Sequence, residues 1–223
     1  QEHGTNHVYS PFPEPQGFGW VYPWHGGVGP ILSFTGWTNW AGFLYRERFS
    51  AQPFRQVDRG GLTWQGVRLS TQPTKPEFAD LIVEVDYLTL AGSRVLKYVY
   101  RLHNLRGTTQ AVKAGSVAAF RLGGEVTELS VYGAHTAHRP TPWSFIIAGQ
   151  RWGALTHERT GKTVVMVGRQ ADVVLNDAGR HGRTLGAISD VHLAGDEVHE
   201  LVYYLVLCDS LAQAREYVVL QDY

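Results

Sequence analysis

The chain has 223 residues, of which 43% are hydrophobic and 18% are charged. This balance is typical of a globular protein and excludes a charge-rich disordered segment. Its 20 lysines and arginines match its 20 aspartates and glutamates, so no overall field attracts nucleic acid or lipid headgroups. We therefore expect no nucleic-acid partner and no membrane partner, while a homo-oligomer stays possible. The length suits one all-β domain over residues 1–223.

Cysteine and histidine usage limits the kinds of site. Cys208 is the sole cysteine, which excludes an intrachain disulfide and a cysteine-based zinc site, and a buried free thiol is expected. His3 and His7 have no third ligand at a recognised spacing, so we predict no metal and no cofactor. Localisation is unknown. The start at Gln1 slightly favours a processed, secreted chain over a cytoplasmic fragment.

The N-terminal part contains the most informative segment. Residues 1–19 are rich in proline and glycine and are expected to form an extended arm or an edge strand. Residues 22–30 then place His25 before three glycines, where the backbone can approach a ligand closely. A neutral imidazole can bond a sugar hydroxyl and act as acid or base near neutral pH. The alternative is a histidine that caps a turn.

Tryptophans surround this histidine. Trp24 precedes it directly, and Trp37 and Trp40 follow within irregular aromatic and small residues. Indole rings stack on the apolar face of a pyranose, although each ring alone is equally suited to core packing. We expect residues 32–49 to be loops that line a ligand cleft.

Four adjacent residues, 45–48, combine a phenol, a carboxylate and two guanidinium groups. On a strand, Tyr45 and Glu47 would share one face, and Arg46 and Arg48 the other. Glu47 is then a candidate general base, and an arginine is a candidate clamp for a carboxylate or sugar hydroxyls. The alternative is a solvated edge strand with surface ion pairs.

Later residues predict regular β-structure. Residues 81–87 alternate apolar and polar side chains, with Glu84 and Asp86 on the polar face. A turn at 91–94 leads to a second alternating run, 95–103, so the two form an antiparallel hairpin. Breakers separate the remaining segments, which favours a sandwich or barrel over βαβ units. Further strands are expected at 116–122, 126–132, 144–148, 152–156, 163–167, 173–175, 185–193 and 197–207, and one helix at 210–218.

Three short motifs lie far apart in the chain: His-Gly-Gly at 25–27 followed by Gly29 and Trp37, Phe-Arg-Leu-Gly-Gly at 120–124, and Leu-Ala-Gly-Asp-Glu at 193–197. Together they resemble the galactose mutarotase-like proteins, the aldose 1-epimerase group. The resemblance implies an all-β antiparallel supersandwich and a sugar ligand. It carries over His25 as a sugar-binding histidine. The catalytic histidine and glutamate that it implies near 116–119 and 165–174 are absent from the sequence.

A second histidine cluster follows in the middle of the chain. His135, His138 and Arg139 lie between Gly133 and Pro140, which predicts a loop. Loops on rigid scaffolds commonly hold binding residues, so this loop is a candidate part of the cleft.

These observations favour a carbohydrate-active enzyme that uses acid/base chemistry of the epimerase, lyase or hydrolase type on a sugar or a uronic-acid-containing saccharide. In a uronic acid, an arginine would neutralise the carboxylate while a histidine or tyrosine removes the α-proton. The alternative is a noncatalytic glycan-binding or structural domain of a larger assembly. The expected catalytic residues are His25, Glu47 and Tyr45, and the expected substrate-binding residues are Trp24, Trp37, Trp40, Arg46, Arg48, His135, His138 and Arg139.

Overall fold

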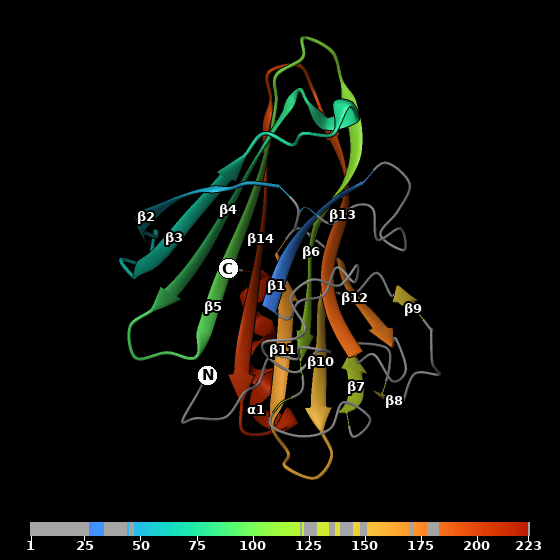
Figure 1. The fold of residues 1–223 in the computed structure, drawn as a ribbon. Helices are drawn as coiled ribbons and strands as arrows, with labels where there is room; N and C mark the ends of the chain where they lie inside the picture. The colour runs from blue at the N-terminus through green and yellow to red at the C-terminus, as the bar shows by residue number, and fades with distance from the viewer. Residues whose placement is uncertain are drawn as a thin grey trace, which may run out of the picture.

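Two antiparallel β-sheets pack against each other in the computed structural model (Figure 1). The structure describes residues 27–33, 44, 47–120, 122, 129–133, 137–138, 145–147, 151–169, 172–177 and 183–222. Every strand pair among them is antiparallel. The predicted all-β antiparallel sandwich is therefore confirmed.

The two sheets differ in size. The smaller has five strands in the order β1 (Gly27–Ser33), β6 (Gln110–Phe120), β13 (Arg183–Leu193), β12 (Asp172–Asp177) and β9 (Phe145–Ile147). The larger has nine, in the order β2 (Ser50–Val57), β3 (Thr63–Thr71), β4 (Leu81–Leu90), β5 (Val95–Asn104), β14 (Val198–Cys208), β11 (Thr163–Gly168), β10 (Trp152–His157), β7 (Leu129–Gly133) and β8 (Ala137–His138).

The hairpin β4–β5 is the part of the fold that its sequence predicts best. Its apolar positions face the smaller sheet, because Val85 and Tyr100 are register partners and both are fully buried. The polar positions of both strands lie on the opposite side, the outer face of the nine-stranded sheet. The turn between them uses Gly92, whose φ of +76° suits glycine. The predicted hairpin and its two faces are confirmed.

The region before this hairpin contains strands that the sequence pattern does not predict. The loop expected over 32–49 is wrong at Leu32 and Ser33, which end β1. β2 is an edge strand with mostly exposed residues and Pro53, so it has little alternation. In β3, a Cβ on Gly66 would lie 1.9 Å from the Tyr87 carbonyl oxygen. Glycine therefore permits the close approach of β3 to β4.

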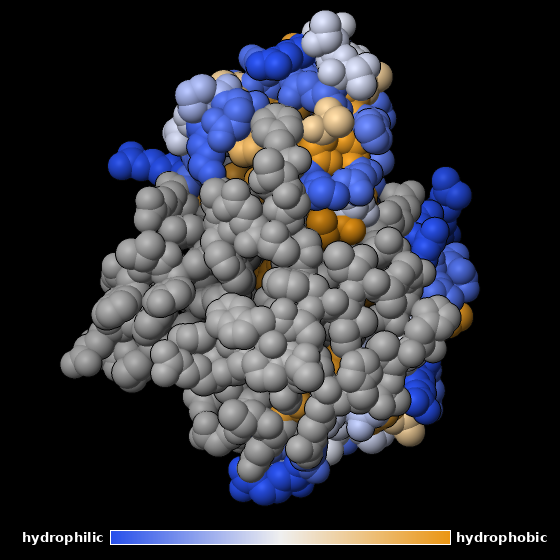
Figure 2. Space-filling model, turned by 90° about the vertical axis from the view of Figure 1, so that its right-hand side faces the viewer, coloured by the Kyte–Doolittle hydropathy of each residue, from blue (hydrophilic) through white to orange (hydrophobic). Residues whose placement is uncertain are grey.

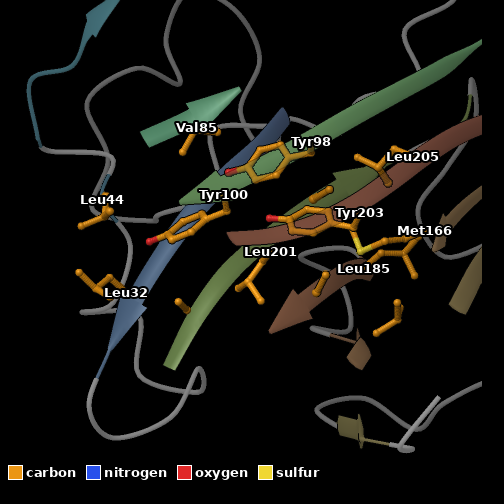
Figure 3. Close-up of a cluster of buried hydrophobic side chains, with 14 of the residues drawn as sticks. Leu32, Leu44, Val85, Tyr98, Tyr100, Met166, Leu185, Leu201, Tyr203 and Leu205 are labelled. Carbon is orange, nitrogen blue, oxygen red and sulfur yellow. The ribbon is translucent and has the colours of Figure 1, made fainter. Parts of the chain in front are cut away.

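Tyrosines form the centre of the core between the sheets. Tyr98 and Tyr203 stack with ring centroids 4.5 Å apart, and both are fully buried (Figure 3). Ser116 of β6 is also fully buried. Among the described residues, the hydroxyls of these three side chains have no hydrogen bond of normal geometry. Burial raises the pKa of both phenols well above its ordinary value, so they are neutral.

The C-terminal segment covers part of the outer face. Helix α1 (Leu211–Glu216) is capped by Ser210, whose hydroxyl accepts a hydrogen bond from the backbone N–H of Gln213 at 3.2 Å. A 3-10 helix, η5 (Tyr217–Asp222), continues it. The helix expected at 210–218 is thus confirmed but ends sooner. Beneath it Cys208 is 2% exposed, and burial raises the pKa of its thiol to about 11.

The described surface is mainly hydrophilic where Figure 2 displays it, with a smaller hydrophobic area near the top of that view.

A short 3-10 helix, η2 (Pro76–Phe78), connects β3 to β4 and buries Phe78 in the core. None of the helices in the described ranges is long and apolar enough to cross a membrane.

Candidate functional site

Four strand ends meet at one edge of the five-stranded sheet. β1 starts at Gly27, which pairs with Ala119 near the end of β6. Arg183, the first residue of β13, pairs both with Phe120 and with Asp177 at the end of β12. We call this region the Gly27 edge. His25 lies two residues before it in the sequence, outside the described residues.

The strand next to β1 supplies no acid or base here. On β6, Ser116 belongs to the buried side that faces the tyrosines, and its neighbour Val117 is 5% exposed. Successive residues of a strand point to opposite faces, so Val117 lies on the outer side of the smaller sheet. The sequence has no histidine between residues 110 and 120. A histidine acting at the Gly27 edge would have to come from another segment.

Glu47 connects two loops. Its carboxylate accepts hydrogen bonds from the Thr74 amide at 2.9 Å and from the Thr74 hydroxyl at 3.2 Å. Its own amide donates to the Leu44 carbonyl at 3.0 Å, and the Leu44 amide donates to Pro30 of β1 at 3.2 Å. These bonds hold the segment between β1 and the loop after β3. The carboxylate therefore has a structural partner at both oxygens.

Arg48 is exposed, and its carbonyl accepts a hydrogen bond from the Thr71 hydroxyl at 2.9 Å. Neither Glu47 nor Arg48 belongs to β2, which begins at Ser50. The strand considered for this segment is therefore wrong at these two positions. Tyr45 and Arg46 lie outside the described residues.

The second histidine cluster is only partly described. His138 belongs to the short strand β8 and pairs with Val131 of β7, so the expected loop is interrupted by a strand. His135 and Arg139 lie outside the described residues, as do the three tryptophans Trp24, Trp37 and Trp40. Their roles remain predictions.

An ion-pair network lies on the outer face of the nine-stranded sheet. The sequence pattern alone does not predict this network. The Asp86 carboxylate is fully buried and accepts two hydrogen bonds from Arg68, at 2.6 and 2.9 Å, and one from Arg101 at 2.5 Å. Arg101 also donates to Glu200 at 2.8 Å. The Arg68 guanidinium lies 3.8 Å from the centroid of the Phe54 ring.

Burial and hydrogen bonding oppose each other at Asp86. Burial alone would raise the pKa of this carboxyl, but the hydrogen bonds from Arg68 and Arg101 outweigh it and hold the pKa below its ordinary value. The alternation of residues 81–87 and 95–103 predicts which residues share this face. It does not predict that Asp86 is buried, because the burial depends on arginines from two neighbouring strands.

A metal centre has no support in the described ranges, where no three histidine, cysteine, aspartate or glutamate side chains are grouped to hold an ion. The basis for a functional assignment is therefore the fold and the residues at the Gly27 edge.

Comparison with known proteins finds similarity in structure but not in sequence. No protein-family model and no curated protein matches the sequence. A putative aldose 1-epimerase from Klebsiella pneumoniae aligns with a TM-score of 0.63 at 11% identity, over 98% of this chain and 75% of that one. A galactose mutarotase-like protein from Lactobacillus casei aligns with a TM-score of 0.57 at 9% identity, over 91% and 89%.

The fold is that of the galactose mutarotase-like proteins. The resemblance expected from the three sequence motifs is confirmed at the level of the fold. The same fold also matches part of a larger protein, the GH36 α-galactosidase AgaB from Geobacillus stearothermophilus, with a TM-score of 0.54 at 10% identity. That alignment covers 81% of this chain but 30% of the α-galactosidase.

Proposed function

We propose that the chain binds a carbohydrate at the Gly27 edge and acts on it by acid/base chemistry. One observation carries the proposal: the strand register sets the start of β1 beside the end of β6 and the start of β13. Consecutive Cα atoms are about 3.8 Å apart, which keeps the Cα of His25 within about 7.6 Å of that of Gly27. Similarity of fold to the putative aldose 1-epimerase and to an α-galactosidase supports a sugar as the ligand.

His25 is the proposed acid/base group. An imidazole with a reference pKa of about 6.5 can give and take a proton near neutral pH. The glycines after His25 leave room for the ligand. Tyr45 is a second proposed acid/base group. The proposed binding residues are Trp24, Trp37, Trp40, Arg46, Arg48, His135, His138 and Arg139.

The contacts of Glu47 favour a second candidate function. Both oxygens of Glu47 accept hydrogen bonds from Thr74, which ties this carboxylate to the loop after β3, although each oxygen keeps a lone pair that can accept a proton. If Glu47 serves only this structural contact and Tyr45 does not act with His25, the domain binds a glycan without converting it. A noncatalytic glycan-binding domain is therefore the second candidate.

A panel of neutral and acidic saccharides separates the two candidates. Binding is measured by calorimetry, and turnover by NMR of each sugar over time, for the wild type, His25→Ala, Trp37→Ala and Glu47→Gln. An enzyme should lose turnover in His25→Ala, and turnover that persists in Glu47→Gln would limit Glu47 to its structural contact. A binding domain should lose affinity in Trp37→Ala without any turnover. If no saccharide binds or reacts, both functions are wrong.

A further inference from the structure

A pocket of about 340 Å³ opens on the outer face of the nine-stranded sheet. Its floor comes from β5 and β14, and it faces away from the core, because its floor residues alternate with the buried Tyr98 and Tyr203. It therefore lies on the other side of that sheet from the five-stranded sheet and the Gly27 edge. We call it the Lys97 pocket, and its lining residues are Gln56, Val57, Asp58, Arg59, Lys97, Arg169, Glu200, Val202 and Tyr204.

Lys97 is the unusual member of this lining. The residue is 8% exposed, although lysine is almost never fully buried unless it is paired. Its ammonium has a long hydrogen bond of 3.5 Å to the Gln56 side chain and lies 5.5 Å from the centroid of the Trp64 ring. Within the part of the chain that the structure describes, no carboxylate forms an ion pair with it.

The two carboxylates of the pocket already have donors of their own. Asp58 accepts hydrogen bonds from the amides of Gly60 and Leu62 and from the Trp64 indole, each at 2.9 Å. Glu200 accepts one from the Arg101 guanidinium at 2.8 Å. Neither carboxylate forms an ion pair with Lys97, although both attract its charge at longer range.

Two further cations stand at the rim. The side chains of Arg59 and Arg169 line the pocket and are exposed. Three cations thus face two carboxylates that are bonded elsewhere. Burial lowers the pKa of Lys97 despite the attraction of Glu200 and Asp58, so an added anion beside the buried ammonium would be stabilising. A neutral or cationic ligand would not supply this charge.

We propose that the Lys97 pocket binds a small molecule carrying an oxyanion, either a carboxylate or a phosphate. Lys97 supplies the buried counter-charge, Arg59 and Arg169 contact the anion from the rim, and Gln56 offers its side-chain amide. The volume is at the lower end of the range for small-molecule sites, roughly 300–1,000 Å³. A ligand of monosaccharide size fits it. This site is separate from the carbohydrate site proposed at the Gly27 edge.

Calorimetric titration with glycerol 3-phosphate, D-glycerate and neutral glycerol tests the proposal on the full chain, because none of these probes contains the sugar ring expected at the Gly27 edge. The wild type should bind at least one of the two anions saturably, and the stronger one identifies the carboxylate or the phosphate as the preferred group. Lys97→Met should weaken that binding by about tenfold or more. Lys113→Met removes a lysine that pairs with Asp190 on the smaller sheet and should leave the affinity unchanged.

Two additional variants keep the result interpretable. Arg169→Ala changes an exposed side chain and should weaken anion binding by about threefold or more, even if Lys97→Met fails to fold. His25→Ala should leave the binding of these ring-free anions unchanged, which separates this pocket from the proposed carbohydrate site. The proposal is overturned if neither anion binds the wild type, if folded Lys97→Met binds the anion like the wild type, or if glycerol binds the wild type as tightly as the anions.

Discussion

Arg68 and Asp86 form a bidentate ion pair on the outer face of the nine-stranded sheet, with N–O distances of 2.6 and 2.9 Å. The carboxylate is fully buried, while the Arg68 side chain is 18% exposed. Arg101 contacts the same carboxylate from β5. One buried anion therefore joins three adjacent strands, β3, β4 and β5.

Replacing this anion should destabilise the fold. Asp86→Asn leaves two guanidinium groups without their shared counter-charge, and breaking a buried pair in this way costs about 3–5 kcal/mol. The unfolding free energy is measured by urea denaturation. Glu200→Gln is the control, because Glu200 is 46% exposed and such a pair contributes about 0–1 kcal/mol. Equal effects of the two substitutions would contradict the role given to Asp86.

Acid should remove the same contribution. The pKa of Asp86 is lowered in the folded chain, so its carboxylate stabilises the fold above its unfolded pKa of about 3.9, and the effect is lost as the pH falls through the folded value. The difference in unfolding free energy between wild type and Asp86→Asn should be constant from about pH 5 to 7 and shrink below about pH 4. A difference independent of pH would refute this assignment.

The core tyrosines should tolerate loss of a hydroxyl. Within the described ranges the Tyr98 hydroxyl is buried without a hydrogen bond of normal geometry, and an unsatisfied buried polar group costs about 1–3 kcal/mol. Tyr98→Phe should therefore leave the melting temperature unchanged or raise it. Tyr98→Ala should lower stability by about 3–5 kcal/mol, as aromatic truncation does in other cores. A clear loss of stability in Tyr98→Phe would indicate a hydrogen bond that this account lacks.

Gly115 should be intolerant of a side chain. Its φ is +155°, and a Cβ there would lie 1.9 Å from the Ala187 carbonyl oxygen on β13. Gly115→Ala must push β6 from β13, so we expect a loss of about 3 kcal/mol or more, within the range of severe substitutions. Gly92→Ala is the matched control. Its φ of +76° also disfavours alanine, but a Cβ meets open space, and the loss should be about 1–2 kcal/mol. Chemical denaturation of both variants checks the order.

How well the sequence predicts the fold depends on burial. Residues 81–87 and 95–103 are buried on one side, so their alternation is clear, and β4 and β5 are predicted with the correct faces. β2 is an edge strand with mostly exposed residues. Because neither of its faces is buried, its sequence does not alternate between apolar and polar residues. Gly66 breaks the strand-like sequence pattern of β3. It is needed because a Cβ there would meet the Tyr87 carbonyl oxygen of β4, and the sequence alone does not show that contact.

The sites follow the same logic. The Lys97 pocket combines residues of β2, the turn after it, β5 and β14 with Arg169, and these segments meet only because of the strand order. No local spacing could predict that. His25 is different, because its neighbours in sequence are themselves the signal. Its position at a ligand site remains a prediction, supported by the start of β1 at Gly27.

The affinity of a saccharide for wild type and His25→Ala tests the central claim most directly, with Lys97→Met as the control on the opposite side of the larger sheet. The saccharide that binds best in the panel is titrated into all three proteins by calorimetry. For the neutral saccharide that binds best, we predict a loss of affinity of about tenfold or more in His25→Ala and wild-type affinity in Lys97→Met. A folded His25→Ala variant that binds the sugar as tightly as the wild type would contradict the proposed site.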